Sequence, residues 1–294
     1  MVRVIAAESQ YANVAAQVGG RYVRIDAVMT NPDTDPHDFE ASLRVASEIN
    51  QAQIAVQNGL GYDVFMSKLE AADGPRGQMV VVAGNLVRNA PDEADNPHLW
   101  YYPATMPAVA AQVAADLGRL QPWHRRYFSQ RLALFDRSLL VWHRALVSLR
   151  RSGRGVAVAV TEPVANYLLQ AAGLRVATPR ALQLAVMNGT DPAPQDIAVQ
   201  DLLIERHRVK ALVYNEQVQD GVTKAFLAAA RKAHVPVVGV YETMPARSYD
   251  YQHWVLSTVT DLARSIGLST APRSKGGSGL APSLPTAPRG GSRP

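Results

Sequence analysis

The chain has 294 residues, 47% of them apolar and 19% charged, and a net charge of +5. This length allows two domains or one large one, with enough apolar material for sizeable cores. No run reaches the roughly 18 apolar residues that a membrane span requires, and the absence of cysteine excludes disulfides, zinc–thiolate sites and thiol catalysis.

The basic charge is concentrated near the C-terminus. Residues 269–294 contain four Lys or Arg and no acid, so the rest of the chain carries only +1. Because this segment is rich in Gly, Pro and Ser, we predict a disordered tail. The basic charge therefore does not indicate a nucleic-acid groove, and no nucleic-acid partner is expected.

The first part of the chain alternates between strand-like and helix-like segments. The expected strands are residues 2–7, 22–28, 53–57 and 79–83. The expected helices between them are residues 9–18, 42–50 and 62–70. This alternation predicts right-handed crossover units on a parallel sheet, forming an N-terminal α/β lobe over residues 1–118.

A long apolar stripe follows in residues 119–152, which we predict to be a linking helix. Neither Gly nor Pro interrupts residues 123–152, and apolar residues recur at spacings of four and three: Phe128, Leu132, Phe135, Leu139, Trp142, Leu146 and Leu149. A helix of this length spans about 40 Å. Packing of this helix along two lobes explains the stripe better than a coiled coil does. A rigid helix of this kind predicts a modest hinge around a small ligand.

The second part of the chain repeats the alternation. The expected strands are residues 156–160, 210–214 and 236–240, with a weaker one near 174–177. The expected helices are residues 163–172, 195–207, 221–233 and 250–266. The predicted fold class is therefore α/β, with two parallel-sheet lobes joined by one long rigid backbone helix, and the C-terminal lobe covers residues 153–268.

Four side chains that can bind a metal come after predicted strands, two in each lobe: His37, His98, Glu162 and Glu242. Ligands of doubly wound sheets bind outside the carboxyl ends of the strands, where an interlobe cleft would form. Taken singly, each has an ordinary alternative, such as a solvated loop residue or an acid at a helix N-terminus. His253 is the remaining histidine nearest to this edge, and we leave it out of the set.

Two neutral imidazoles and two carboxylates suit a divalent first-row metal. Their total charge of −2 balances the ion, and nitrogen and oxygen donors are combined. The oxygen content favours Mn²⁺, whereas Zn²⁺ generally binds such sites more tightly. Imidazoles must be deprotonated to bind, so affinity is expected to fall as the pH drops through about 6.5.

Three motifs resemble the periplasmic metal-binding receptors of zinc and manganese ABC importers, the cluster A-I solute-binding proteins. The segment NPDTDPHDFE (31–40) resembles the family's DPHxFE signature, QNGLGY (57–62) its NGLGYD turn, and NPHLW (96–100) its DPHxW element. The resemblance extends from about residue 2 to residue 268. It implies two α/β lobes joined by one long helix.

The resemblance also implies a ligand set. His37 and His98 match the first two ligands, and Glu162 matches the third, which is Glu in many manganese receptors and usually His in zinc receptors. Glu242 or a neighbour matches the fourth, which is most often Asp in the family. The loop before His98 lacks the histidine cluster of many zinc receptors, which weakens the argument for zinc. Because other signals favour zinc, both Zn²⁺ and Mn²⁺ remain candidates for the native metal.

The expected function is that of an extracytoplasmic receptor that captures Zn²⁺ or Mn²⁺ in the cleft and delivers it to an ABC transporter permease. We expect a monomer without a membrane span, on the periplasmic or extracellular side of the cell envelope. Met1 is followed at once by a strand-like run, so no signal peptide is visible in this sequence.

The main alternative is a metal-dependent hydrolase that uses the His₂-carboxylate set to activate water. No HExxH, GxSxG or P-loop motif accompanies the four candidates, and a receptor is favoured over an enzyme. A surface adhesin or another interaction module is a third possibility, but such a role does not require four convergent donors.

Overall fold

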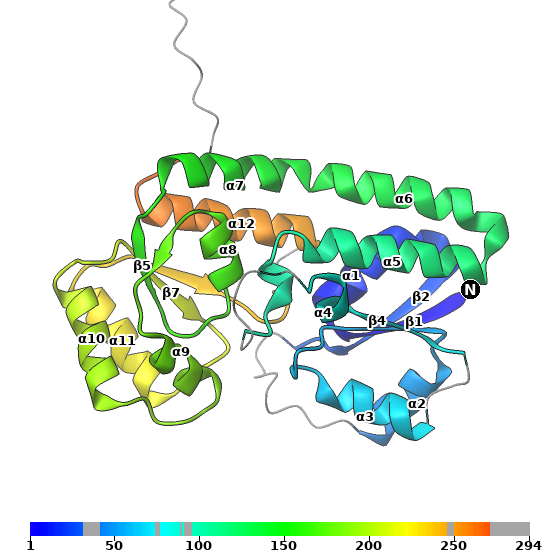
Figure 1. Cartoon of the computed structure of the whole chain (residues 1–294), viewed down its shortest axis with the longest axis horizontal. Helices are drawn as coiled ribbons and strands as arrows, with labels where there is room; N and C mark the ends of the chain where they lie inside the picture. The colour runs from blue at the N-terminus through cyan, green and yellow to red at the C-terminus, as the bar shows by residue number, and fades with distance from the viewer. Residues whose placement is uncertain (32–41, 74–76, 89, 91–95, 246–249, 271–294) are drawn as a thin grey trace, which may run out of the picture.

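The computed structural model describes residues 1–31, 42–73, 77–88, 90, 96–245 and 250–270. Two α/β lobes lie beneath one long helical segment (Figure 1). Each lobe has a four-stranded sheet in which all pairings are parallel. This confirms the predicted fold class. Beyond residue 270, the predicted disordered tail lies outside the described residues.

The N-terminal sheet has the order β2-β1-β3-β4. Its strands are β1 (Val2–Glu8), β2 (Val23–Met29), β3 (Ile54–Gln57) and β4 (Met79–Val82). All four begin and end within one residue of the predicted bounds. In β1 every residue after Arg3 is buried, as expected for a central strand covered on both faces.

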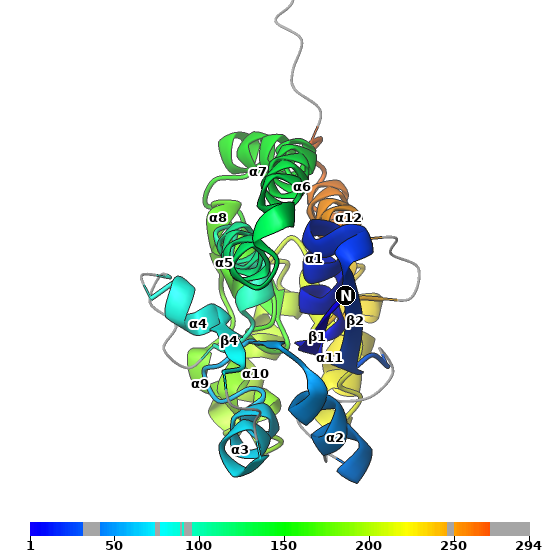
Figure 2. The same ribbon diagram turned by 90° about the vertical axis from the view of Figure 1, so that its right-hand side faces the viewer.

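Helices cover both faces of this sheet: α1 (Ser9–Gly19), α2 (Leu43–Gln51), α3 (Val64–Asp73), the short α4 (Ala83–Leu86) and α5 (Thr105–Leu120). Ile5 and Ala7 of β1 pack with α2 and α3, whereas Val4 and Ala6 face the opposite core, on the side of α1 and α5 (Figure 2). The 3₁₀ segments are Gly20–Tyr22, Leu99–Tyr101 and Pro122–His124. Helix α5 was not predicted.

The C-terminal sheet has the order β6-β5-β7-β8, which repeats the N-terminal arrangement. Its strands are β5 (Ala157–Val160), β6 (Arg175–Val176), β7 (Leu212–Asn215) and β8 (Val237–Val240). Its helices are α8 (Asn166–Ala171), α9 (Arg180–Met187), α10 (Pro194–Glu205), α11 (Gly221–Lys232) and α12 (Tyr251–Ser265). Helix α9 was missing from the prediction, and the weaker strand near 174–177 forms the two-residue β6.

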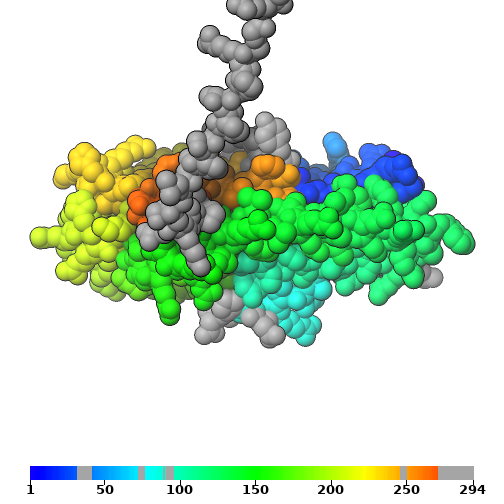
Figure 3. All heavy atoms as spheres, turned by 90° about the horizontal axis from the view of Figure 1, so that it is seen from above, coloured from blue at the N-terminus to red at the C-terminus, as the bar shows by residue number. Residues whose placement is uncertain are grey.

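The connecting helix consists of α6 (Arg125–Ser138) and α7 (Leu140–Ser152). Only Leu139 separates them, and the bond from the Leu139 N–H to the Phe135 carbonyl (3.3 Å) carries the helical path through it. Seen from above, this helix runs from one lobe to the other (Figure 3). Six of the seven stripe residues are buried, and Leu132 is half-buried against the same core.

One apolar core joins the lobes. It includes Val4 of the first sheet, Trp142 of the connecting helix and Val158 of the second sheet. Such a continuous core restricts bending between the lobes. Within the part of the chain that the structure describes, no helix is long and apolar enough to cross a membrane.

Candidate metal centre

The C-terminal lobe supplies two buried carboxylates directly after its strands. Glu162 follows β5 by two residues and Glu242 follows β8 by two residues. Both strands pair in parallel with β7, so their carboxyl ends lie at the same edge of the sheet. Glu242 is 0% exposed and Glu162 is 3% exposed. Two acids held in this way need positive partners to offset their desolvation.

The N-terminal lobe supplies His98, which lies in a loop just before the 3₁₀ segment Leu99–Tyr101. Its side chain is fully buried. The imidazole makes edge-on contacts with the rings of Tyr62 and Trp100, at centroid distances of 5.9 Å and 5.3 Å. These aromatic walls fix the orientation of the imidazole and keep water away from it.

Asn96 determines which nitrogen of His98 is available. The Asn96 amide donates to the Pro163 carbonyl (2.9 Å), so its Oδ1 is the atom that faces His98. Oδ1 lies 2.6 Å from His98 Nδ1 and 3.1 Å from the His98 backbone nitrogen. Because an amide oxygen only accepts, Nδ1 carries the hydrogen. In the neutral imidazole, Nε2 therefore keeps its lone pair.

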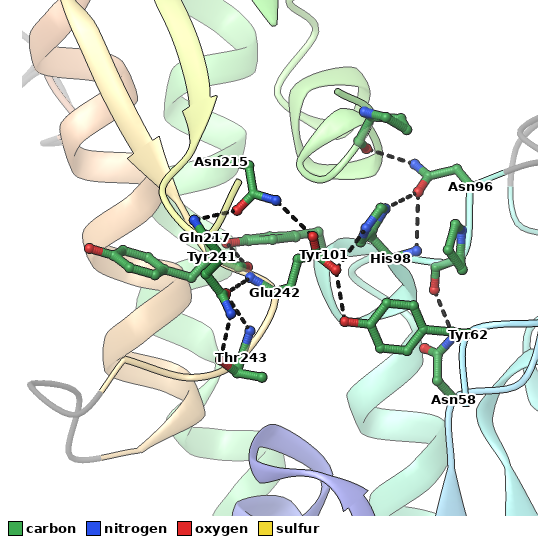
Figure 4. A network of polar contacts seen from close by, with 12 residues as sticks. Asn58, Tyr62, Asn96, His98, Tyr101, Asn215, Gln217, Tyr241, Glu242 and Thr243 are labelled. Carbon is green, nitrogen blue, oxygen red and sulfur yellow. Dashed lines mark hydrogen bonds and ion pairs between the residues drawn. The ribbon is translucent and has the colours of Figure 1, made fainter. Parts of the chain in front are cut away.

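His98 Nε2 faces Glu242 across the boundary between the lobes (Figure 4). The distance from Nε2 to Glu242 Oε2 is 3.4 Å. With Nδ1 protonated, a nitrogen lone pair and a carboxylate oxygen point at each other, and only a proton or a cation between them makes this favourable. Two donors each about 2.1 Å from a tetrahedral ion lie about 3.4 Å apart, so this pair fits a metal.

Hydrogen bonds hold the Glu242 carboxylate at both of its oxygens. The Tyr62 hydroxyl donates to Oε2 (2.8 Å), and the Asn215 amide donates to Oε1 (2.7 Å). The Glu242 main chain is held as well, since its N–H donates to Gln217 Oε1 (2.6 Å) and its carbonyl accepts from Gln10 Nε2 (2.9 Å). Tyr62 and Gln10 belong to the N-terminal lobe, so both lobes fix the position of Glu242.

Tyr62 extends from a tight loop that begins at Asn58. The loop needs left-handed backbone at three consecutive residues, with φ of 80° at Gly59, 55° at Leu60 and 81° at Gly61. Glycine adopts this conformation without a steric penalty, which explains the two glycines of the NGLGY motif. The Asn58 amide also donates to the Pro97 carbonyl (2.7 Å), which ties this loop to the segment of His98.

Asp63 closes the loop. Its carboxylate accepts the backbone N–H groups of Asn58 (2.5 Å) and Gly59 (2.8 Å). Burial raises the pKa of Asp63 to about 6, although these two hydrogen bonds act in the opposite direction. Burial, and then the charge of Asp63, also raises the pKa of Glu8 well above its ordinary value. Asp63 in this loop and Glu8 at the end of β1 therefore hold their protons to unusually high pH.

The structure brings His98 and Glu242 together and places Glu162 at the same edge of the second sheet. His37 lies outside the described residues. Among the residues that the structure describes, no group of three or more His, Asp or Glu could hold a metal, so the His98–Glu242 pair needs further donors. His253 lies elsewhere, with Nδ1 2.7 Å from Asp250 Oδ1 at the start of α12.

The sequence-based prediction missed the neutral residues that orient the donors: Tyr62, Asn96, Asn215 and Gln217. Only groups that could bind a metal directly were sought. Asn215 is the last residue of β7 and lies at the same sheet edge as both glutamates. Tyr62 and Asn96 are part of the motifs that carry the resemblance. Strand ends and motifs could therefore have identified three of the four.

Known proteins resemble this chain along most of its length. The manganese-binding lipoprotein MntA of Bacillus subtilis (strain 168) is 23% identical over 248 residues, which are 81% of this chain and 79% of MntA. The periplasmic zinc-binding protein TroA of Treponema pallidum has a TM-score of 0.73 at 17% identity, over 90% of this chain and 99% of TroA.

The solute-binding protein FpvC of Pseudomonas aeruginosa, whose structure is a complex with Mn²⁺, has a TM-score of 0.74 at 17% identity over 90% of this chain and 98% of FpvC. At such identities the two structures show a shared fold. The family model described as "Zinc-uptake complex component A periplasmic" matches residues 4–265. The chain belongs to this family of periplasmic zinc-uptake components.

Proposed function

We propose that the protein is a receptor that captures a divalent transition metal, Zn²⁺ or Mn²⁺, between its lobes and delivers it to an ABC transporter permease. The observation that carries this proposal is the buried pair His98 Nε2 and Glu242 Oε2, 3.4 Å apart and contributed by opposite lobes. A cation between them joins the lobes directly. The family match supports a metal-uptake component rather than a hydrolase.

The proposed ligand set is His37, His98, Glu162 and Glu242. The bond from Asn96 to the Pro163 carbonyl supports this set, because it links the His98 loop to the residue after Glu162. A doubly charged ion offsets the mutual repulsion of the two carboxylates. The relatives differ in the metal that their names state, manganese for MntA and zinc for TroA, so both metals are candidates.

Release follows from the division of the donors between the lobes. If the permease pulls the lobes apart, Glu242 is withdrawn from Tyr62 and His98, and the ion loses part of its ligand set. The continuous core under the connecting helix keeps this movement small. We further propose a monomeric receptor on the periplasmic or extracellular side of the envelope, with its lobes and linking helix divided near residues 118 and 152.

The test is calorimetric titration of Zn²⁺ and Mn²⁺ into the wild type, His37→Ala and His98→Ala. His253→Ala is the matched control, because its imidazole lies at the start of α12. We expect one ion per wild-type chain and per control chain, and strongly weakened binding in the other two variants. Undiminished stoichiometry and affinity in both His37→Ala and His98→Ala would refute the proposal.

A further inference from the structure

The connecting helix carries a large excess of positive charge. Residues 121–155, which contain α6 and α7, have eight arginines and a single acid, Asp136, and so a net charge of +7. The segment 269–294 carries +4, so the remainder of the chain has a net charge of −6. The charge of the molecule is therefore segregated, with a basic helix on one side and the lobes beneath it (Figure 1).

Four of these arginines lie in one row along the helix: Arg126, Arg137, Arg144 and Arg151. Their spacings of eleven, seven and seven residues are close to whole numbers of turns, at about 3.6 residues per turn. Phe135 of the buried stripe comes nine residues after Arg126, which is about two and a half turns, so the stripe and the row lie on opposite sides. All four arginines are exposed. Among the described residues, none of them forms an ion pair with an acid.

Apolar side chains on the same helix are also exposed, each between 44% and 58%: Leu134, Leu140, Val141 and Val147. A groove of about 1550 Å³ between α7 and α12 continues this outer face, which Figure 3 shows from above. The described lining of the groove includes Arg144 and Arg151 and no acid. On α12, Asp261 is paired with Arg264 (2.7 Å). This surface therefore suits a partner that is both anionic and apolar.

The charge of the surface disfavours two occupants from the chain itself. Ser269 and Thr270 line the groove, so residues 271–294 begin beside it, but they carry four cations and no acid. A second copy that presented the same face would place one arginine row against another. An anionic phospholipid bilayer matches both features of the surface, because it has negative headgroups and apolar chains directly below them.

We propose that the outer face of α6 and α7 is a docking surface for an anionic phospholipid membrane, with the arginine row at the headgroups. The apolar stripe of the helix is buried in the protein core, so the helix rests on the bilayer and does not insert its own apolar face. The lobes then project away from the membrane. This inference goes beyond the proposed function and does not depend on it, because the surface is remote from His98 and Glu242 and needs no metal.

The test is co-sedimentation of the metal-free full chain with vesicles of phosphatidylglycerol and phosphatidylcholine in equal parts, and with vesicles of phosphatidylcholine alone. We expect binding to the anionic vesicles only. This binding should be lost at about 0.5 M salt, where charges are screened beyond about 4 Å. Absence of binding to both kinds of vesicle at low salt, or equal binding to both, would overturn the inference.

Arg137→Gln/Arg144→Gln/Arg151→Gln tests whether this face makes the contact. Its affinity for anionic vesicles should fall about 100-fold, since each cation near such a surface contributes about fivefold. The corresponding triple Lys variant keeps the charge and should keep most of the binding. Arg206→Gln/Arg208→Gln/Lys210→Gln is the matched control, because it removes three positive charges from exposed residues after α10.

The control should bind as the wild type does. Equal losses in the control and in the triple Gln variant of the helix would show that net charge alone matters, and unchanged binding in the helix variant would assign the contact to another part of the chain. Either result overturns the inference. Sedimentation equilibrium without vesicles should give a monomer. A dimer that the helix variant abolishes would assign the surface to a second copy and would also overturn the inference.

Discussion

The two lobes share one strand order, yet they position their candidate metal donors in different ways. In the C-terminal lobe, Glu162 and Glu242 each follow a strand by two residues, so the sheet itself determines where they lie. In the N-terminal lobe, β4 ends at Val82, and His98 does not follow it directly, because α4 comes between them. Sheet geometry places the backbone of both glutamates, and hydrogen bonds then hold the Glu242 carboxylate. His98 follows no strand directly and depends on side-chain contacts alone.

One fold thus places one half of the candidate site by strand ends and the other half by side-chain contacts. Backbone at a strand end is restrained by the ladder bonds of its neighbours. His98 instead depends on Asn96, on the rings of Tyr62 and Trp100, and on a loop closed by Asp63. Mutations of supporting residues should therefore affect the N-terminal half most, whereas only loss of a donor should disable the C-terminal half.

The largest effect is expected for Glu242→Ala. The change removes a donor together with the acceptor for Tyr62 and Asn215, and leaves two buried hydrogen-bond donors unpaired. Zn²⁺ affinity should fall by more than about 100-fold, beyond the range typical of residues that only orient a ligand. Competition with a chromophoric chelator measures this. Glu216→Ala is the control, because Glu216 directly follows the neighbouring strand β7, and this variant should bind Zn²⁺ normally. Unchanged affinity in Glu242→Ala would show that Glu242 does not bind the ion.

A smaller loss is expected for Asn96→Leu, which tests the support of His98. Without the Asn96 oxygen, Nδ1 of His98 loses its acceptor and the imidazole no longer favours the tautomer that leaves Nε2 free. Affinity should fall about 10- to 100-fold. NMR of the imidazole nitrogens reports the tautomer directly. Gln112→Leu on α5 serves as control, and wild-type affinity in Asn96→Leu would mean that the aromatic walls alone orient His98.

Tyr62→Phe should weaken binding by about tenfold or less, because it removes one hydrogen bond to Glu242 and keeps the aromatic wall beside His98. Tyr101→Phe provides a matched comparison. Its hydroxyl also crosses between the lobes, but it bonds the main chain of Tyr241 (3.1 Å to the carbonyl) where Tyr62 bonds the Glu242 carboxylate. If both variants lose the same affinity, Tyr62 contributes to lobe closure in general and has no particular role at the carboxylate.

The smallest effect concerns the pH dependence of the metal-free protein. The folded-state pKa of Asp63 is raised to about 6. The folded state thus binds this proton more tightly than the unfolded state, and the associated stability is present at low pH and lost as the pH rises through about 6. Between pH 7 and pH 5 the free energy of unfolding should rise by about 1 kcal/mol from this group.

Thermal unfolding of the wild type and Asp63→Asn between pH 5 and pH 7 measures this contribution. The variant should show a flatter dependence, because it has no proton to gain at this position. Glu8 and Glu70 also have raised pKa values, so part of the dependence should remain. An identical slope in both proteins would show that Asp63 keeps its charge throughout, and that the loop bonds outweigh its burial.

Sequence patterns correctly placed Glu162 and Glu242 just after strands, because apolar runs such as VVGV (237–240) determine where a strand ends and which residue follows it. They predicted the connecting helix for a similar reason, since a stripe from Phe128 to Leu149 has one apolar face to bury. The position of His98 could be inferred only from its motif. Neither periodicity nor propensity indicates where a residue comes to lie when it does not directly follow a strand.

The hydrogen bonds around the donors were beyond pattern-based prediction. The contact between Tyr62 and Glu242 joins residues 180 positions apart. It forms because the left-handed loop that carries Tyr62 in one lobe lies next to the strand end that carries Glu242 in the other. Helix α5 was missed because it lies between β4 and the connecting helix, outside any crossover between strands. Helix α9 was missed because a single helix was expected between β6 and β7, where α9 and α10 both lie.

The central claim is that donors from both lobes bind the same ion. A crystal structure of the protein loaded with Zn²⁺, with the ion located by anomalous scattering at the zinc edge, tests this most directly. We expect a single strong peak about 2.0–2.2 Å from both His98 Nε2 and Glu242 Oε2. A peak that touches only one lobe, or one remote from this pair, would contradict it.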